Sequence, residues 1–120
     1  MAKILVADDN EINRKMLEII LKKSEYEYVS ASDGKEVLEI VDKEDISLIF
    51  MDCQMPEMNG YQATYELRKK EKMMPIIAVT GSSEDEDKEE AKKSGMDDYL
   101  LKPYKREDIE VILKKWLQSY

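Results

Sequence analysis

Four short runs of apolar residues constrain the fold of this chain more than any other feature. Each is rich in Ile, Leu or Val and has the length of a strand; they are Ile4–Ala7, Leu48–Met51, Ile76–Val79 and, more weakly, Tyr99–Leu101. Continuous apolar runs, without polar alternation, are typical of strands covered on both faces. They predict a parallel sheet with helices on either side. A fifth segment, Tyr26–Ala31, alternates in part and is expected nearer a sheet edge.

Helical patterns with recognisable ends lie between these runs. Asn10 and Asp33 stand where side chains cap helices, and apolar residues recur behind each of them at helical spacing. A third helix is expected at about residues 60–71. The last helix has the clearest pattern, although its expected cap position holds Lys105, whose side chain cannot cap. Its apolar residues follow the helical template without a gap: Ile109, Ile112, Leu113, Trp116 and Leu117.

The fourth helix, roughly residues 84–94, is predicted to have well-marked ends and almost no apolar face. Ser83 and Glu86 predict a capping box at its start, and Gly95 predicts its end. Ala91 is the only apolar residue within it. Because a helix that is polar all round buries little surface, we expect it to be the most loosely docked helix of the fold.

Strand and helix alternate five times along the chain. Right-handed crossovers then predict an α/β fold, a doubly wound (βα)5 arrangement with an open parallel sheet. The functional site of such a sheet lies beyond the carboxyl ends of its strands, where the strand order reverses. Since 120 residues is the usual size of one domain, residues 1–120 are expected to form a single domain.

Polar residues stand at four of the predicted strand ends. Asp8 and Asp9 follow the first strand, Asp52 the third, Thr80 the fourth and Lys102 the fifth. Taken singly, each has an ordinary explanation as a helix cap, a turn residue or a solvated lysine. Taken together, three carboxylates at one sheet edge repel one another unless a cation offsets them. A hard divalent ion with oxygen ligands, such as Mg²⁺, is the natural counterion.

This set of groups suits phosphoryl transfer to an aspartate. Such a transfer needs charge neutralisation and positioning more than it needs an acid or a base. Lys102 can supply a second positive charge, and Thr80 can donate a hydroxyl hydrogen bond to phosphoryl oxygens. The strand-end residues therefore indicate phosphoryl chemistry that depends on Mg²⁺.

The motifs at these positions closely resemble the receiver domains of response regulators, the family that includes the chemotaxis regulator. The matching segments are VADDNEINR, IFMDCQMPEMNG, IAVTG and DDYLLKPY. The resemblance extends from Lys3 to Trp116 and implies a flavodoxin-like sheet with strand order 2-1-3-4-5. The wording of DDNEINR and DCQMPEMNG is most similar to the receivers of hybrid histidine kinases and phosphorelays.

Carried over residue by residue, the resemblance implies that Asp52 is the phosphorylated residue. Asp9 and Asp52 would bind Mg²⁺ directly, Asp8 would act through water, and Gln54 would contribute its backbone carbonyl. Gln54 and Ser82 occupy positions that vary in the family and tune the lifetime of the phosphoryl group.

The resemblance also implies the moving parts of the site. Lys102 would pair with the acceptor and then with the phosphoryl group, and the Lys102–Pro103 peptide would be cis. Thr80 and Tyr99 would form a switch pair, in which Thr80 moves toward the phosphoryl oxygens and the Tyr99 ring then turns inward. Gly81 departs from the alanine that is common in the family, which leaves space at the site.

The expected partners are a histidine kinase or histidine phosphotransfer domain as phosphoryl donor, and a downstream protein target. Lys and Arg number 19 against 27 Asp and Glu, so the net charge of −8 repels nucleic acid and acidic membranes. No direct nucleic acid or membrane partner is expected. Cys53 is the only cysteine and no signal segment is visible, so a reduced, cytoplasmic protein is predicted, with Cys53 as a packing residue.

Three other interpretations compete. A flavodoxin-like redox protein would need a Ser-, Thr- and Gly-rich phosphate loop, whereas residues 8–11 are Asp-Asp-Asn-Glu and would repel FMN. A Mg²⁺-dependent phosphatase with Asp52 as nucleophile would need an acid or base two residues later, and Gln54 cannot serve as either. A receiver that works without phosphorylation would not need all five site residues. We therefore expect a phosphoacceptor that assists its own phosphorylation and slow dephosphorylation, not an enzyme acting on outside substrates.

Overall fold

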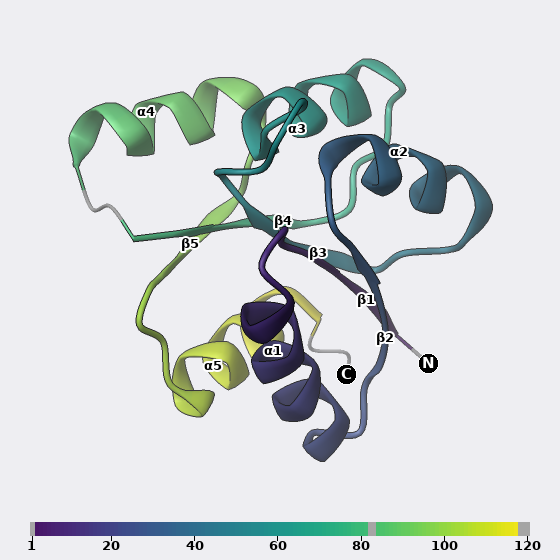
Figure 1. Cartoon of the computed structure of the whole chain (residues 1–120), viewed down its shortest axis with the longest axis vertical. Helices are drawn as coiled ribbons and strands as arrows, with labels where there is room; N and C mark the ends of the chain where they lie inside the picture. The colour runs from purple at the N-terminus through teal and green to yellow at the C-terminus, as the bar shows by residue number, and fades with distance from the viewer. Residues whose placement is uncertain (1, 82–83, 118–120) are drawn as a thin grey trace.

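The computed structural model describes residues 2–81 and 84–117. Within them, strands and helices alternate along the whole chain (Figure 1). The strands are β1 (Lys3–Ala7), β2 (Glu27–Ala31), β3 (Leu48–Asp52), β4 (Ile76–Thr80) and β5 (Asp98–Leu101). The helices are α1 (Glu11–Lys23), α2 (Gly34–Lys43), α3 (Gly60–Lys69), α4 (Asp85–Ser94) and α5 (Arg106–Leu117).

All strand pairs are parallel, and the sheet order is β2-β1-β3-β4-β5. This confirms the predicted doubly wound α/β fold with order 2-1-3-4-5. The order reverses between β1 and β3, where Ala7 is paired with Met51, and Asp52 is paired with Val79 of β4 on the other side. The carboxyl ends of these strands therefore finish at one edge of the sheet.

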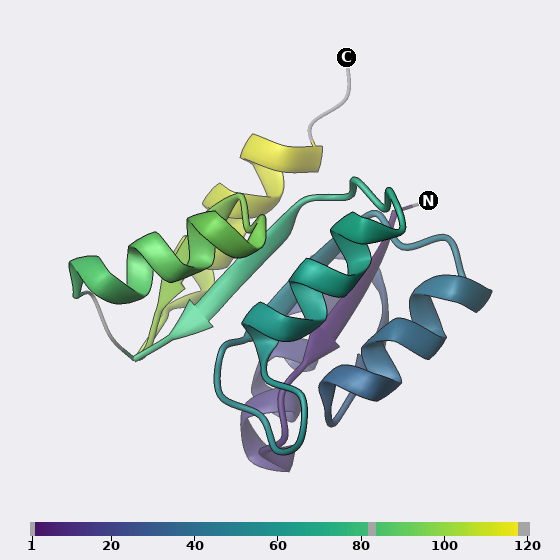
Figure 2. The same cartoon turned by 90° about the horizontal axis from the view of Figure 1, so that it is seen from above.

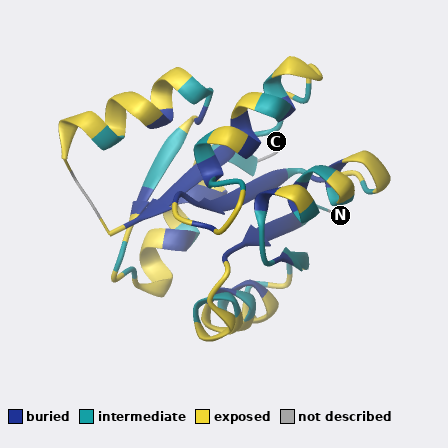
Figure 3. Cartoon of the chain, turned by 45° about the horizontal axis from the view of Figure 1, so that its top comes forward, coloured by how far each residue is buried: buried dark blue, intermediate teal, exposed yellow. Residues whose placement is uncertain are grey.

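Helices cover both faces of the sheet. In Figures 1 and 2, α1 and α5 lie on one side, and α2, α3 and α4 lie on the other. Alternate strand residues enter the two core clusters, so Ile4 packs with α1 and α5 while its neighbour Leu5 packs on the opposite side. The central strands β3 and β4 are buried along their whole length (Figure 3), which explains why their sequences do not alternate. Strand β2 is more exposed, as predicted for an edge strand.

The predicted caps of the first two helices are present. Oδ1 of Asn10 accepts the N–H of the residue three positions on at 3.0 Å, and Oδ1 of Asp33 does the same at 2.8 Å. Helix α3 has a capping box, formed by Asn59 and Gln62, that the sequence analysis did not predict. It ends at Lys69, two residues before the predicted end. No helix among the described residues is long and apolar enough to cross a membrane.

Helix α5 is held by hydrogen bonds near both ends and by a buried apolar face. Lys105 does not cap it with its side chain, but Oδ2 of Asp108 accepts the backbone N–H of Lys105 at 2.8 Å, which supplies half of a capping box. Near its other end, Nε1 of Trp116 donates to Oδ2 of Asp98 in β5 at 2.8 Å. Its inward face buries Ile109, Ile112 and Leu113.

Helix α4 is built differently. It begins at Asp85, one residue later than predicted, with Glu84 as its N-cap. Ser83, the predicted partner of Glu86 in a capping box, lies outside the described residues. Ala91 is the one buried residue of the helix, as the sequence predicts. The helix ends at Gly95, whose φ of 108° lies in the left-handed region that favours glycine.

Arg68 of α3 holds the carboxyl end of α4 in place. Its Nη1 donates to the carbonyls of Lys72 and Met74, at 2.6 and 2.9 Å, and its Nε donates to the carbonyl of Gly95 at 3.0 Å. Its Nη2 is 2.8 Å from Oδ2 of Asp97. We call this set of bonds the Arg68 clamp. The sequence analysis did not predict it.

Candidate functional site

Three carboxylates meet at the carboxyl edge of the sheet. Asp8 directly follows β1 and Asp52 is the last residue of β3, so the reversal of strand order brings them side by side. Asp8, Asp9 and Asp52 each place an oxygen within 4.8 Å of the others. Asp8 and Asp52 are buried and Asp9 is exposed. The structure thus brings together the three acids that were predicted from strand ends.

Backbone hydrogen bonds orient the two buried carboxylates. Oδ1 of Asp8 accepts the N–H of Asn10 at 2.9 Å, and Oδ1 of Asp52 accepts the N–H of Gln54 at 3.0 Å. These are the local bonds with which Asp stabilises a turn two residues on. The other oxygens face Lys102, whose Nζ lies 3.6 Å from Oδ2 of Asp52 and 3.7 Å from Oδ2 of Asp8. One ammonium is therefore shared between two carboxylates.

Lys102 and Thr80 reach this edge from β5 and β4. The backbone N–H of Lys102 donates to the carbonyl of Thr80 at 2.8 Å, and the Lys102–Pro103 peptide is cis. Thr80 is buried at the end of β4. Among the residues that the structure describes, no heavy atom lies within 4 Å of the place where a Cβ would stand on the next residue, Gly81. The departure at Gly81 therefore leaves open space, as expected.

The site carries more negative charge than its lysine can balance. Burial, and to a smaller degree repulsion from Asp8, raise the pKa of Asp52 to about 6, although the Gln54 N–H and Lys102 act in the opposite direction. A carboxyl with this pKa is mostly ionised at neutral pH, so the folded protein keeps a buried negative charge that lowers its stability. A cation that binds oxygen ligands would offset this loss of stability.

The chain leaving the acceptor strand packs tightly against it. Gly60 donates its N–H to the carbonyl of Cys53 at 3.2 Å, and a Cβ at Gly60 would overlap the carbonyl oxygen of Asp52. Cys53 itself is buried, and burial raises the pKa of its thiol to about 11. Cys53 is thus a neutral packing residue, in keeping with the sequence prediction.

Tyr99 lies in β5, paired with Ala78 of β4 two residues before Thr80. Its hydroxyl is buried and has no hydrogen-bond partner among the described residues. The inward turn of the ring on phosphorylation stays a prediction, and in this structure the hydroxyl is already buried. Burial raises the pKa of this hydroxyl, and two nearby side chains, Cys53 after β3 and Asp87 in α4, act in the same direction.

Two further residues support the site and were missed from the sequence. Arg14 of α1 donates from Nη1 to the backbone carbonyl of Asp8 at 2.7 Å, which ties the acidic loop to the first helix. Tyr104 is half-buried, and burial together with the charges of Asp8 and Asp52 raises the pKa of its hydroxyl. The only feature of the sequence that could have indicated this role is the position of Arg14, a positive charge one turn into the first helix after the acidic pair.

Comparisons with known sequences agree with this geometry. The sequence pattern of the response regulator receiver domain matches residues 4–114. Hybrid signal transduction histidine kinase B of Dictyostelium discoideum is 40% identical across 96% of the chain, which spans 7% of that kinase. The CAI-1 autoinducer sensor kinase/phosphatase CqsS of Vibrio cholerae is 39% identical across 94% of the chain, which spans 16% of it. The chain thus spans only a small part of these two relatives.

Solved structures place the chain in the same group. Chemotaxis protein CheY4 of Vibrio cholerae has a TM-score of 0.93 and 32% identity, covering 98% of this chain and 99% of that one. The receiver domain of sensor histidine kinase PA1611 from Pseudomonas aeruginosa, with magnesium in its active site cleft, has a TM-score of 0.91 and 35% identity, covering 98% of both chains. The Saccharomyces cerevisiae receiver of Ssk1, crystallised with the histidine phosphotransfer protein Ypd1, has a TM-score of 0.91 and 31% identity, covering 96% and 88%. The chain belongs to the response regulator receiver domains of two-component signalling systems.

Proposed function

We propose that Asp52 accepts a phosphoryl group from a histidine of a kinase or phosphotransfer protein, in a reaction that requires Mg²⁺. The observation that carries this proposal is the cluster of three carboxylates within 4.8 Å of one another, with Lys102 at 3.6 Å from Asp52. An Asp52 oxygen would form the new bond to phosphorus while the bond from phosphorus to the donor imidazole nitrogen breaks. Lys102 is positioned to stabilise the charge that develops on the phosphoryl oxygens.

The residues present fit a magnesium ion. They offer only oxygen ligands, and the raised pKa of Asp52 reflects its burial and the nearby charge of Asp8. Asp9, Asp52 and the backbone carbonyl of Gln54 would hold the ion directly, and Asp8 would act through water. When bound, the ion supplies neutralisation of the acidic cluster and of the phosphoryl oxygens. The magnesium in the cleft of the PA1611 receiver supports this assignment.

Thr80 and Tyr99 would transmit the state of Asp52 to a downstream protein. Thr80 is buried at the end of β4, in the strand that leads toward α4. A shift of its hydroxyl toward a phosphoryl group would be felt by Tyr99, whose strand is paired with β4. Loosely docked α4 is then the element whose surface changes at the lowest cost.

The phosphoryl donor and the setting of the chain are part of the same proposal. The Ypd1 and Ssk1 complex supports a histidine phosphotransfer protein as one kind of donor, and CqsS supports a kinase as the other. We also propose a cytoplasmic location, which suits the free thiol of the buried Cys53. The domain would assist its own phosphorylation and slow dephosphorylation without turning over outside substrates.

Mass spectrometry after incubation with acetyl phosphate and Mg²⁺ tests the acceptor. The wild-type protein should gain the mass of one phosphoryl group, and Asp52→Asn should gain none. Asp45→Asn, which changes an exposed aspartate elsewhere, is the matched control and should behave as the wild type does. A full mass gain in Asp52→Asn would show that another residue is the acceptor.

Thermal unfolding with and without Mg²⁺ tests the metal ligands. A ligand that binds only the folded state raises the midpoint of unfolding, so the wild-type midpoint should rise with Mg²⁺. Asp9→Asn should lose much of that response. Its midpoint without metal should be equal or higher, because one repelling charge has gone. An equal response of both proteins to Mg²⁺ would remove Asp9 from the ligand set.

A further inference from the structure

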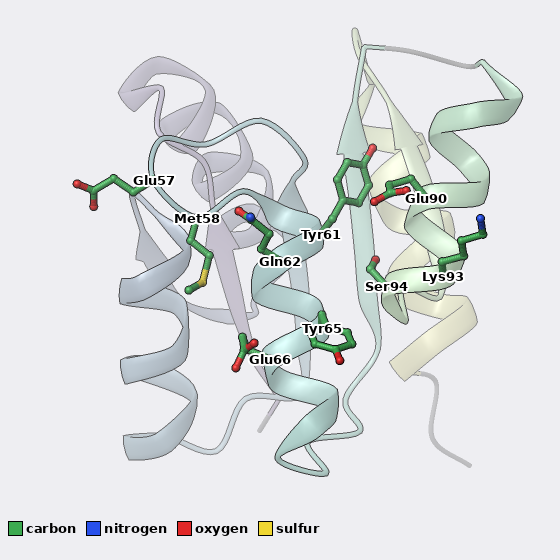
Figure 4. A pocket seen from close by; sticks show the side chains of 9 residues that line it. All are labelled: Glu57, Met58, Tyr61, Gln62, Tyr65, Glu66, Glu90, Lys93 and Ser94. Carbon is green, nitrogen blue, oxygen red and sulfur yellow. The ribbon is translucent and has the colours of Figure 1, made fainter.

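A hollow of about 470 Å³ opens over helix α3 and toward α4, away from the acidic cluster (Figure 4). We call its part between the two helices the α3–α4 groove. Tyr61 and Tyr65, one turn apart on α3, form one wall, and Glu90, Lys93 and Ser94 of α4 form the other. Figure 4 shows the Tyr61 ring beside the carboxylate of Glu90. The groove thus combines aromatic surface with a carboxylate.

The aromatic wall is suited to a cation. Tyr65 is 55% exposed, which is high for a large aromatic side chain. Nζ of Lys69 lies 5.5 Å from the centre of the Tyr65 ring, so this ring already attracts a positive charge from its own helix. Guanidinium groups stack on aromatic faces more readily than ammonium groups, because they are planar and weakly hydrated.

The charge around the groove has one dominant sign. Three glutamates line the hollow, Glu57 and Glu66 on the far side of α3 and Glu90 on α4 (Figure 4). Among the described residues, Lys93 is its one lining lysine, and Lys69 lies beside Tyr65. Residues 85–90 of α4 include five acids and one lysine, and all but Asp87 are exposed. A protein segment that docks here must therefore be basic to be attracted.

Both walls of the groove are held in place. Glu90, Lys93 and Ser94 lie in the carboxyl half of α4, at the end that the Arg68 clamp joins to α3. On the other wall, Tyr61 packs against the apolar core cluster. The groove is therefore preformed, and a segment that binds there need not order its walls.

We propose that the α3–α4 groove binds a basic segment of a partner protein, with an arginine guanidinium stacked on the tyrosine wall and paired with Glu90. The contact is separate from the phosphoacceptor site and does not require a phosphoryl group. It would let a partner dock on the unphosphorylated domain through a surface distinct from the acidic cluster.

The test is a calorimetric titration of the unphosphorylated protein, without Mg²⁺, with a short peptide of alternating arginine and serine. Glu90→Gln should weaken binding roughly two- to fivefold, as expected for an exposed ion pair. Glu89→Gln removes the same charge from an exposed position of the same helix outside the groove and should have a smaller effect. Tyr65→Phe should keep the affinity, and Tyr65→Leu should lower it about two- to fivefold.

A pair of lysine variants tests the groove by an expected increase in affinity. Lys93→Ala removes the repelling charge of the groove and should tighten binding about twofold, while Lys92→Ala, outside the groove, should tighten it less. Equal effects within the glutamate pair or within the lysine pair would mean diffuse attraction to an acidic helix and would overturn the proposal. Unchanged affinity in Tyr65→Leu, or no binding to the wild type, would overturn it as well. Because no phosphoryl group is involved, these outcomes are independent of whether Asp52 proves to be the acceptor.

Discussion

Helices α4 and α5 flank the same strand, β5, in the sequence, yet they are attached to the molecule in different ways. Helix α5 buries Ile109, Ile112 and Leu113, and each fully buried side chain of this size contributes about 1.5 to 3 kcal/mol. Helix α4 buries only Ala91 and is held at one end by the Arg68 clamp. Two helices of similar length in one small domain can therefore differ in docking energy by several kcal/mol.

The comparison shows where this fold can change shape. The Arg68 clamp binds the carboxyl end of α4. The amino end of α4 lies closer in the chain to Thr80, at the functional site. A helix held at its far end can swing at its near end without breaking an apolar core. The face of the sheet that carries α5 has no such freedom, because α5 is packed along its length.

Hydrogen exchange should show the largest difference between the two helices. Buried amides of α5 should exchange at least about a hundredfold more slowly than those of α4, which corresponds to roughly 3 kcal/mol in local opening. Exchange in residues 84–94 should slow after treatment with acetyl phosphate and Mg²⁺, if the switch orders the helix. Equal protection of the two helices in both states would contradict the comparison.

Side-chain truncation should separate the helices next. Leu113→Ala should lower the free energy of unfolding by about 2 to 5 kcal/mol, because it leaves a cavity under α5. Glu89→Ala in α4 should change it by no more than about 0.5 kcal/mol, since the side chain is exposed. Urea unfolding of both variants measures this. A comparable loss in Glu89→Ala would mean that α4 is docked through contacts other than burial.

Removal of the Arg68 clamp should lower the free energy of unfolding by an intermediate amount, and its effect on hydrogen exchange should be confined to α4. Arg68→Met keeps the aliphatic stem but removes four hydrogen bonds, so we expect a loss of about 1 to 3 kcal/mol. Exchange should accelerate in α4 and not in α5. Lys69→Met, at a neighbouring exposed position, is the control. Acceleration in both helices would show that the clamp supports the whole fold and not α4 alone.

The smallest effect concerns the link between α5 and β5. Burial tends to raise the pKa of Asp98, but hydrogen bonds from the Trp116 indole and the Tyr99 N–H, with the ion pair to Lys115, lower it overall. A carboxyl with a lowered folded pKa stabilises the protein above its unfolded pKa of about 3.9 and loses this contribution as pH falls through the folded value. Asp98→Asn should therefore cost about 1 kcal/mol at neutral pH, and the difference from wild type should shrink below about pH 4.

Unfolding measured across this pH range checks the sign. Asp42→Asn, at an exposed aspartate, should show a much smaller difference from wild type at every pH. A gap between Asp98→Asn and wild type that persists unchanged in acid would mean that the charge of Asp98 does not matter, and that only its shape does.

The features that could be predicted from the sequence are those that depend on neighbouring residues or on burial. The apolar runs predicted β3 and β4 because strands covered on both faces leave no polar alternation. Asn10 and Asp33 predicted helix starts because a cap bonds only three residues away. The clustering of Asp8 and Asp52 was predictable because parallel strands end at one edge whatever their side chains do.

The features that were missed join distant parts of the chain or compete locally. Arg68 bonds to Asp97, 29 residues away, and nothing in the sequence distinguishes it from a solvated arginine. The capping box of Asn59 and Gln62 also went unpredicted, although its two residues stand at the spacing that this motif requires. At the start of α4, consecutive polar residues offer several alternative caps, which explains the error of one residue there.

The bond between Trp116 and Asp98 also has an optical consequence. Trp116 is the only tryptophan of the chain, its indole N–H is bonded to a carboxylate, and the ammonium of Lys115 lies 5.4 Å from its ring. Indole emission is sensitive to such nearby charges and to contact with water. The tryptophan fluorescence of this protein therefore originates from the firmly packed side of β5, and it records the integrity of that side without an added label.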